Sequence, residues 1–127
     1  LGAKMHEAGM NVQGQEFGYT ESHQLAVDVT DLGGGDEVAR HLKDNNIILN
    51  MNLLPHEPLE NVTSPAGIRL GVQEMTRFGM KEKEMEVIAG FLKKCLIDGK
   101  YVGEEVKEFR SQFQEVQYSF DQMTVEV

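Results

Sequence analysis

The chain has 127 residues, which is enough for one domain with its own hydrophobic core. Its composition, 40% hydrophobic and 26% charged, is typical of a globular protein, and its net charge of −9 argues against a general binder of nucleic acid or of anionic membranes. No apolar run approaches the roughly 18 residues of a membrane-spanning helix, and no signal peptide is visible, so we expect a cytoplasmic protein. Cys95 is the only cysteine, which excludes a disulfide framework and predicts a buried, inert thiol.

The beginning of the chain predicts one helix and two extended segments. Residues 1–8 have helical spacing, and Gly9 closes the helix. Since the chain starts within this helix, we expect it to be a fragment of a longer protein. Extended structure is predicted from Val12 to Phe17, and the apolar alternation of residues 25–29 predicts a half-buried strand.

A run of three glycines, residues 33–35, precedes a helix that is predicted to begin with Asp36 as N-cap and to end at Asn46. Such a run can bind a phosphate through its free backbone amides. Here the lysine and the spacing of a phosphate-binding loop are missing, and Asp36 and Glu37 would face the anion. We therefore interpret the run as a connector.

The second half of the chain predicts two further strands and three helical segments. These are a short apolar strand at 47–49, a long irregular loop at 50–66 with all three prolines, a strand at 67–71, a helical turn ending at Gly79, and helices over 81–98 and 103–119. The last helix carries an apolar stripe that favours packing on a core over a short coiled coil, formed by Val106, Phe109, Phe113, Val116 and Phe120. The element order predicts an α+β fold: a small, mostly antiparallel sheet of three to four strands with helices packed on one face.

Arg69 is the residue most indicative of function. It lies within the apolar strand between Gly67 and Gly71, where an arginine is costly to bury unless an anion meets it. Its planar guanidinium matches a carboxylate or a phosphate. From this residue alone, an internal bridge to an aspartate or glutamate is the commoner outcome, and a ligand anion is the alternative.

The other polar residues give weaker indications. None of His6, His23, His41 and His56 has a partner at metal-ligand spacing, so no metal site is predicted. Ser22 and Ser64 lack a local base or a nucleophile motif. Three asparagines in and around the long loop could contact a ligand or could form turns, namely Asn50, Asn52 and Asn61.

Four segments of the chain resemble serine hydroxymethyltransferases, in the family's order and spacing. Asn50-Met51-Asn52-Leu53-Leu54-Pro55 is similar to the family's V-N-K-N-x-x-P loop. Ser64 to Gly71, followed by Met75 to Met80, is similar to its T-S-G-I-R-[IL]-G-T-P-A-[LM]-T-x-R-G segment. Residues 21–29 resemble its T-D-N-H-L-x-L-V-D-L segment, and residues 81–96 its E-x-x-x-[IV]-A-x-[FL]-I helix. The likeness extends from about residue 1 to residue 120.

The resemblance implies that residues 1–127 are the C-terminal small domain of a fold-type-I enzyme that depends on pyridoxal phosphate. The full-length protein would be a cytoplasmic homodimer that interconverts serine and glycine and transfers one carbon to a reduced pterin. Arg69 would bind the substrate carboxylate, and Asn52 would contact the pterin carrier. The Schiff-base lysine would lie in the large domain of the same chain, so the fragment alone is expected to be inactive, with no catalytic residue, metal, nucleic acid or membrane partner of its own.

Two departures from the family pattern bear on the carrier. Residues 61–63 stand near the position of a Ser-Pro-Phe segment, with one extra residue in the loop, and residues 72–74 replace Thr-Pro-Ala. Tetrahydrofolate and tetrahydromethanopterin are therefore both open as co-substrates. The competing hypotheses are the small domain of a threonine aldolase or aminotransferase, and a non-catalytic carboxylate-binding domain.

Overall fold

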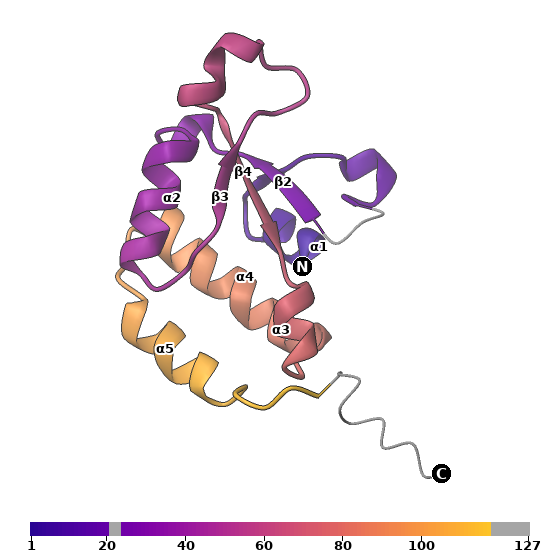
Figure 1. Cartoon of the computed structure of the whole chain (residues 1–127), viewed down its shortest axis with the longest axis vertical. Coiled ribbons are helices and arrows are strands. Elements are labelled where there is room, and N and C mark those ends of the chain that lie inside the picture. The colour runs from indigo at the N-terminus through magenta and orange to yellow at the C-terminus, as the bar shows by residue number, and fades with distance from the viewer. Residues whose placement is uncertain (21–23, 118–127) are drawn as a thin grey trace.

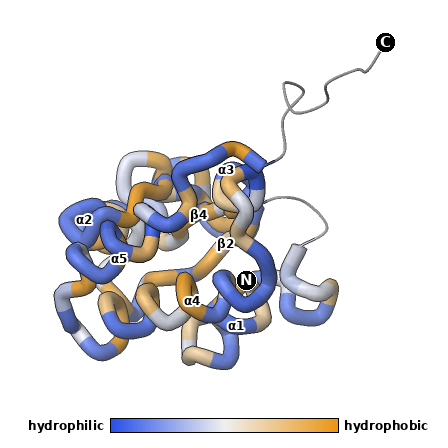
Figure 2. The backbone as a smooth tube through the Cα atoms, turned by 90° about the horizontal axis from the view of Figure 1, so that it is seen from below, coloured by the Kyte–Doolittle hydropathy of each residue, from blue (hydrophilic) through white to orange (hydrophobic). Residues whose placement is uncertain are grey.

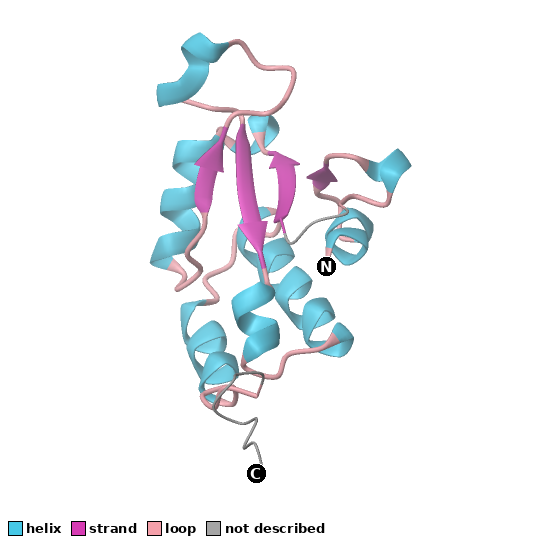
Figure 3. Cartoon of the chain, turned by 45° about the vertical axis from the view of Figure 1, so that its right-hand side comes forward, coloured by secondary structure: helices cyan, strands magenta, loops and turns pink. Residues whose placement is uncertain are grey.

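The computed structural model describes residues 1–20 and 24–117, which form one antiparallel four-stranded sheet with helices on one side (Figures 1 and 3). The strand order is β1-β2-β4-β3. The strands are β1 (Asn11–Val12), β2 (Gln24–Asp28), β3 (Asn50–Asn52) and β4 (Gly67–Gly71). The helices are α1 (Gly2–Glu7), α2 (Gly35–Asp44), α3 (Gln73–Arg77), α4 (Glu82–Leu96) and α5 (Gly103–Ser111), with short 3-10 turns at Gln15–Phe17, Thr30–Leu32 and Leu59–Thr63. The predicted α+β class is confirmed.

The two faces of the sheet differ sharply in burial. Along β2 and β4, Leu25, Val27 and Ile68 are at most 6% exposed and belong to the hydrophobic core. The alternate positions Ala26 and Arg69 are half-buried and lie on the other face, because successive side chains of a strand point to opposite sides. In Figure 2 hydrophobic segments of β4 and α4 lie toward the interior, whereas much of α2 and α5 is hydrophilic. We call the second face of the sheet the open face.

Helix α4 contributes buried residues to the core side. Its buried residues Met85, Leu92 and Cys95 recur at helical spacing. At the start of the helix the Glu84 carboxylate accepts the backbone N–H of Lys81 at 2.8 Å, which explains why a glutamate is only 8% exposed. The predicted helix over 81–98 is therefore confirmed, with ends at Glu82 and Leu96.

The predicted strand at 47–49 is wrong, and the strand lies three residues later. Ile47 still belongs to the turn that ends α2, since its N–H donates to Leu42 O at 2.9 Å, and Ile48 is 84% exposed. The ladder is formed instead by β3, whose residue Asn50 pairs with Arg69 of β4. β3 is an edge strand that is held by backbone hydrogen bonds to one neighbour. Because its side chains are mostly polar, the sequence shows no apolar alternation that would predict a strand there.

Two further boundaries differ from the sequence prediction. The extended segment predicted from Val12 to Phe17 stops after Val12, because Gly14 and Gly18 have left-handed φ angles of 76° and 74° around a 3-10 turn. Helix α2 is capped by Gly34 rather than Asp36, since φ 90° with ψ 170° favours glycine. Asp36 instead pairs with Arg40 at 2.8 Å.

The last helix is shorter than predicted, because α5 ends at Ser111 and not at 119. Beyond it the chain turns toward α3, where Gln117 N donates to Arg77 O at 2.8 Å. The aromatic part of the predicted stripe packs on the body of the protein, with the Phe109 ring 5.6 Å from the ring of Phe91. Phe120 lies outside the described residues.

Candidate functional site

Arg69 lies at the centre of the open face. It is directly opposite Ala26 of β2 on one side and Asn50 of β3 on the other. Arg69 is half-buried, and within residues 1–20 and 24–117 no ion pair or hydrogen bond engages its guanidinium. The internal bridge that a single arginine in a strand usually makes is therefore not formed in this part of the chain.

The acidic residue placed closest to Arg69 by the strand register is engaged elsewhere. Asp28 lies on the same face, diagonally across the β2–β4 ladder, where Cα atoms are about 7–8 Å apart. Its Oδ1 accepts the backbone N–H of Thr30 at 2.9 Å and the Thr30 hydroxyl at 2.6 Å. The hydroxyl and then the amide of Thr30 lower the pKa of Asp28, so the carboxylate stays ionised and directed to the turn.

Asn50 and Asn52 share the open face with Arg69, because Asn50 pairs directly with Arg69, and Asn52, two residues along the same strand, points to the same side as Asn50. Asn50 is exposed. It is the direct cross-strand neighbour of Arg69, and the Cβ atoms of such neighbours are roughly 5 Å apart. Asn52 is half-buried, and its amide donates to Leu53 O at 2.9 Å. The predicted pair Arg69 and Asn52 is thus brought to one surface, together with Asn50.

Asn61, His6 and His41 make their contacts away from this surface in the described structure. The Asn61 amide lies 3.4 Å from Glu57 Oε2 within the long loop. His6 contacts Gln15 at 3.2 Å, and His41 lies 3.3 Å from the backbone oxygen of Cys95. His23 and Ser22 lie outside the described residues. Among the residues described, no group of three or more His, Cys, Asp or Glu side chains could hold a metal ion.

The loop between β3 and β4 is held closed by Glu57, whose role was not anticipated. Its carboxylate accepts the N–H of Leu54 at 2.8 Å and the N–H of Ala66 at 2.9 and 3.0 Å. The Leu54 amide is the main cause of the lowered pKa of Glu57. Since Asn52 precedes this loop and Arg69 follows it, the carboxylate helps to fix the distance between the two site residues.

Two glycines make this arrangement sterically possible. A Cβ on Gly67 would lie 2.5 Å from Leu54 Cδ2 and 2.8 Å from Asn52 O. A Cβ on Gly35, at the start of α2, would lie 2.3 Å from Gly67 O and 2.9 Å from Pro65 O. The glycine run is therefore a connector, as the sequence indicated, and its last residue lets α2 approach the strand that carries Arg69.

These features describe an anion site without reactive groups. The guanidinium of a half-buried arginine with amide side chains beside it can bind and orient a carboxylate. The sole thiol, Cys95, is 1% exposed, and burial raises its pKa, so it remains protonated and unreactive. Among the described residues of β2, β3 and β4, no lysine lies on the open face.

Comparison with known proteins gives the family of this chain. The family model described as serine hydroxymethyltransferase matches residues 1–92. The chain belongs to this family.

Serine hydroxymethyltransferases of three archaea illustrate the similarity. The Saccharolobus islandicus protein is 53% identical over 97% of this chain, the Aeropyrum pernix protein 54% over 94%, and the Methanothermobacter marburgensis protein 47% over 96%. The chain spans 28 to 29% of the length of these curated relatives. A crystal structure of L-threonine transaldolase from Pseudomonas fluorescens superposes with a TM-score of 0.82 and 34% identity, over 98% of this chain and 29% of that one.

Members of the serine hydroxymethyltransferase family use pyridoxal phosphate, and the described residues fit a supporting role toward that group. A site for it needs an amine to hold its aldehyde carbon and donors for its phosphate. The open face supplies Arg69 and amides but, among the described strand residues, no amine.

Proposed function

We propose that the polypeptide containing this chain interconverts serine and glycine and transfers one carbon to a reduced pterin. In this proposal, residues 1–127 are the C-terminal small domain of a cytoplasmic homodimer. The observation that carries it is the half-buried Arg69 on the open face, whose guanidinium has no acidic partner in the described chain. The family membership gives this arginine its ligand class, an amino acid with an α-carboxylate.

Arg69 would receive the carboxylate through two parallel N–H donors, which fixes the plane of the substrate as well as its position. Asn50, directly across the ladder, is placed to donate to the same anion. Bound pyridoxal phosphate would supply the electron sink for the bond that breaks, and the large domain would hold it. The chain described here contributes orientation, because a substrate held at one end presents one bond to the cofactor.

Asn52 is proposed to contact the pterin carrier. It lies on the same face as Arg69 at the start of the loop closed by Glu57. Its amide both donates and accepts, as pterin ring nitrogens and the pterin carbonyl require. Tetrahydrofolate and tetrahydromethanopterin share these ring groups, so a comparison of the two carriers with the same enzyme would identify the co-substrate.

The test uses the full-length protein loaded with pyridoxal phosphate and supplied with serine and each carrier. Arg69→Lys keeps the charge but loses the paired donors, and we expect KM for serine to rise by about 10²-fold, equivalent to about 3 kcal/mol. Asn52→Ala should raise KM for the carrier and leave KM for serine within about twofold. An unchanged serine KM in Arg69→Lys would refute the proposal.

The isolated chain is expected to be inactive, because no described residue of the open face can hold the cofactor. Mixing purified residues 1–127 with pyridoxal phosphate should give no absorbance band of a lysine-bound cofactor that changes with serine. A serine-dependent band would contradict the division of labour between the two domains.

A second candidate is aldol chemistry on threonine-like substrates. The similarity to a threonine transaldolase at 34% identity favours it over the chemistry of an aminotransferase. The same carboxylate clamp would serve there, so Arg69 cannot distinguish the two. Turnover of serine that depends on the pterin supports the first proposal, whereas cleavage of threonine without pterin supports the second.

A further inference from the structure

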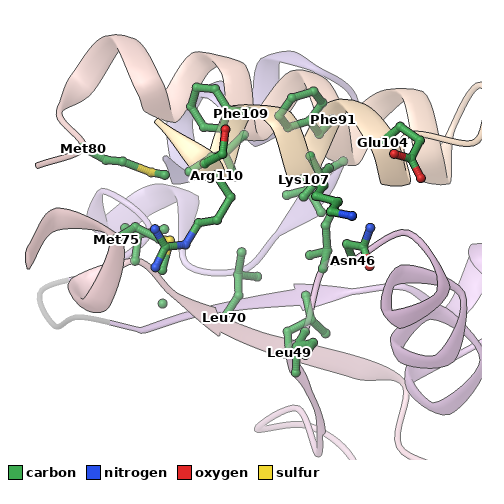
Figure 4. A pocket seen from close by; sticks show the side chains of 18 of the residues that line it. Asn46, Leu49, Leu70, Met75, Met80, Phe91, Glu104, Lys107, Phe109 and Arg110 are labelled. Atoms are coloured by element: carbon green, nitrogen blue, oxygen red, sulfur yellow. The ribbon is translucent and has the colours of Figure 1, made fainter. Parts of the chain in front are cut away.

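The fold contains a cavity that the proposed function does not use. It has a volume of about 920 Å³ and lies between α5, α4 and the core side of β4 (Figure 4). Leu70 lines it, whereas the preceding residue Arg69 points to the opposite face of the sheet. The cavity is therefore separate from the open face, and its size is within the range of small-molecule sites.

The walls of the cavity are apolar and adaptable. Leu70 and Leu49 form the sheet side, Phe91 lies on α4, and Met75 and Met80 close one end (Figure 4). Methionine side chains are flexible and fit ligands of different shape. At the mouth, Ile48 and Tyr101 are 84% and 63% exposed, so apolar surface continues from the cavity to solvent.

Two cations of α5 line the same cavity. Lys107 and Arg110 are three residues apart, which places them on one side of the helix, and both side chains extend toward the sheet in Figure 4. Within the described chain neither forms an ion pair. The Arg110 guanidinium donates to Phe113 O and lies 4.6 Å from the Phe78 ring centroid, which leaves further N–H donors unused. Glu104 also lines the cavity, at the end away from Arg110.

We propose that this cavity binds a small amphipathic anion, with its apolar body between α4 and β4 and its acidic group at Lys107 and Arg110. The charges that line the cavity favour this ligand class. The chain as a whole carries a net charge of −9, and yet two cations line an apolar cavity and have no acidic partner among the described residues. A neutral apolar ligand would contact the apolar walls but would not interact favourably with the two cations. A cationic ligand would meet both positive charges.

The test uses the full-length protein and two probes of equal chain length, decanoate and decanol, titrated by calorimetry below their aggregation concentrations. We expect saturable binding of one decanoate per chain and binding of decanol that is about tenfold weaker, as loss of a charge-assisted hydrogen bond predicts. Lys107→Met should weaken the binding of decanoate by about tenfold and leave the affinity for decanol unchanged. Lys43→Met, an exposed lysine of α2 that does not line the cavity, is the matched control and should bind decanoate normally.

The location of the decanoate-binding site is tested by NMR of methyl-labelled methionines in the same protein. Decanoate should shift the signals of Met75 and Met80, assigned with Met→Leu variants, and not those of the buried Met5 and Met10. Equal affinity for decanol and decanoate would overturn the assignment of an anion. Absence of saturable binding would show that another part of the polypeptide covers the cavity, and that result also overturns the proposal.

Discussion

Glu57 holds the backbone N–H of Ala66 between its two carboxylate oxygens, at 2.9 and 3.0 Å. The same carboxylate accepts the N–H of Leu54 at 2.8 Å, so one side chain ties both ends of the loop that separates β3 from β4. A loop of this length would otherwise have a large conformational entropy. The site residues on either side of it, Asn52 and Arg69, therefore owe their relative position partly to a residue that bonds to neither of them.

Glu57→Gln should loosen this loop without unfolding the sheet. The amide keeps the size of the side chain but replaces a charged acceptor with a weaker neutral one. We expect faster hydrogen exchange at Leu54 and Ala66 and, in the full-length protein, a larger rise in KM for the pterin carrier than for serine. Glu60→Gln is the matched control, since Glu60 is exposed in the same loop. Unchanged exchange at Ala66 in Glu57→Gln would contradict the role given to this carboxylate.

The loop should also respond to acid in a defined direction. The pKa of Glu57 is lowered from its ordinary value of 4.5, first by the Leu54 amide. A lowered folded-state pKa means that the stabilisation is present above the ordinary pKa and is lost as pH falls through the folded value. The amide proton shift of Ala66 should therefore titrate with a midpoint below the ordinary value of 4.5. A midpoint above that value would show that burial outweighs the hydrogen bonds.

Arg69 should be nearly dispensable for folding. It has no ion pair in the described chain, so its removal leaves no buried acid unpaired. We expect Arg69→Met to change the free energy of unfolding by less than about 1 kcal/mol, the range of a partly exposed site without partners. Urea unfolding of the chain measures this. A loss several times larger would indicate a structural ion pair and would weaken the assignment of a substrate clamp.

Local sequence patterns were sufficient to predict that the helices exist and where Arg69 lies, because both depend on periodicity and flanking glycines, but they misplaced the end of α5 and the N-cap of α2. They were insufficient for β3, whose ladder uses backbone groups at an edge and whose residues Asn50 and Asn52 have low strand propensity. Glu57 and Asn45 could not be identified as structural residues either. Their partners are backbone groups that no sequence periodicity marks: Glu57 bonds to Leu54 and Ala66 within the loop, and Asn45 bonds to Val102, 57 residues away.

Asn45 should be important for stability out of proportion to its size. It is 2% exposed, its Oδ1 accepts the N–H of Val102 at 2.7 Å, and its Nδ2 donates to His41 O at 2.9 Å. The amide thus joins the end of α2 to the start of α5. Asn45→Ala leaves a buried donor at Val102 unpaired, and we expect a loss of about 1–3 kcal/mol in urea unfolding. Asn61→Ala, which removes an exposed amide, should cost less than about 0.5 kcal/mol.

Two glycine-to-alanine substitutions should have opposite effects. At Gly35 the new methyl group would lie 2.3 Å from Gly67 O and 2.9 Å from Pro65 O, and backbone atoms cannot move aside cheaply. We expect Gly35→Ala to lower the free energy of unfolding by about 1–3 kcal/mol, as overpacking does. Gly90, inside α4, has nothing within 4 Å of the place that a Cβ atom would take, and Gly90→Ala should stabilise the helix by about 0.5–1 kcal/mol.

The comparison separates a steric requirement from a general preference for glycine. Both substitutions reduce the entropy of the unfolded chain alike, so that contribution cancels between them. The remaining difference reports the close approach of α2 to β4. Because the contact is made at Gly67, two residues before Arg69, Gly35→Ala should also displace the guanidinium and raise KM for serine in the full-length protein, whereas Gly90→Ala should not. Equal stability of the two variants would show that the helix and the strand are not in close contact.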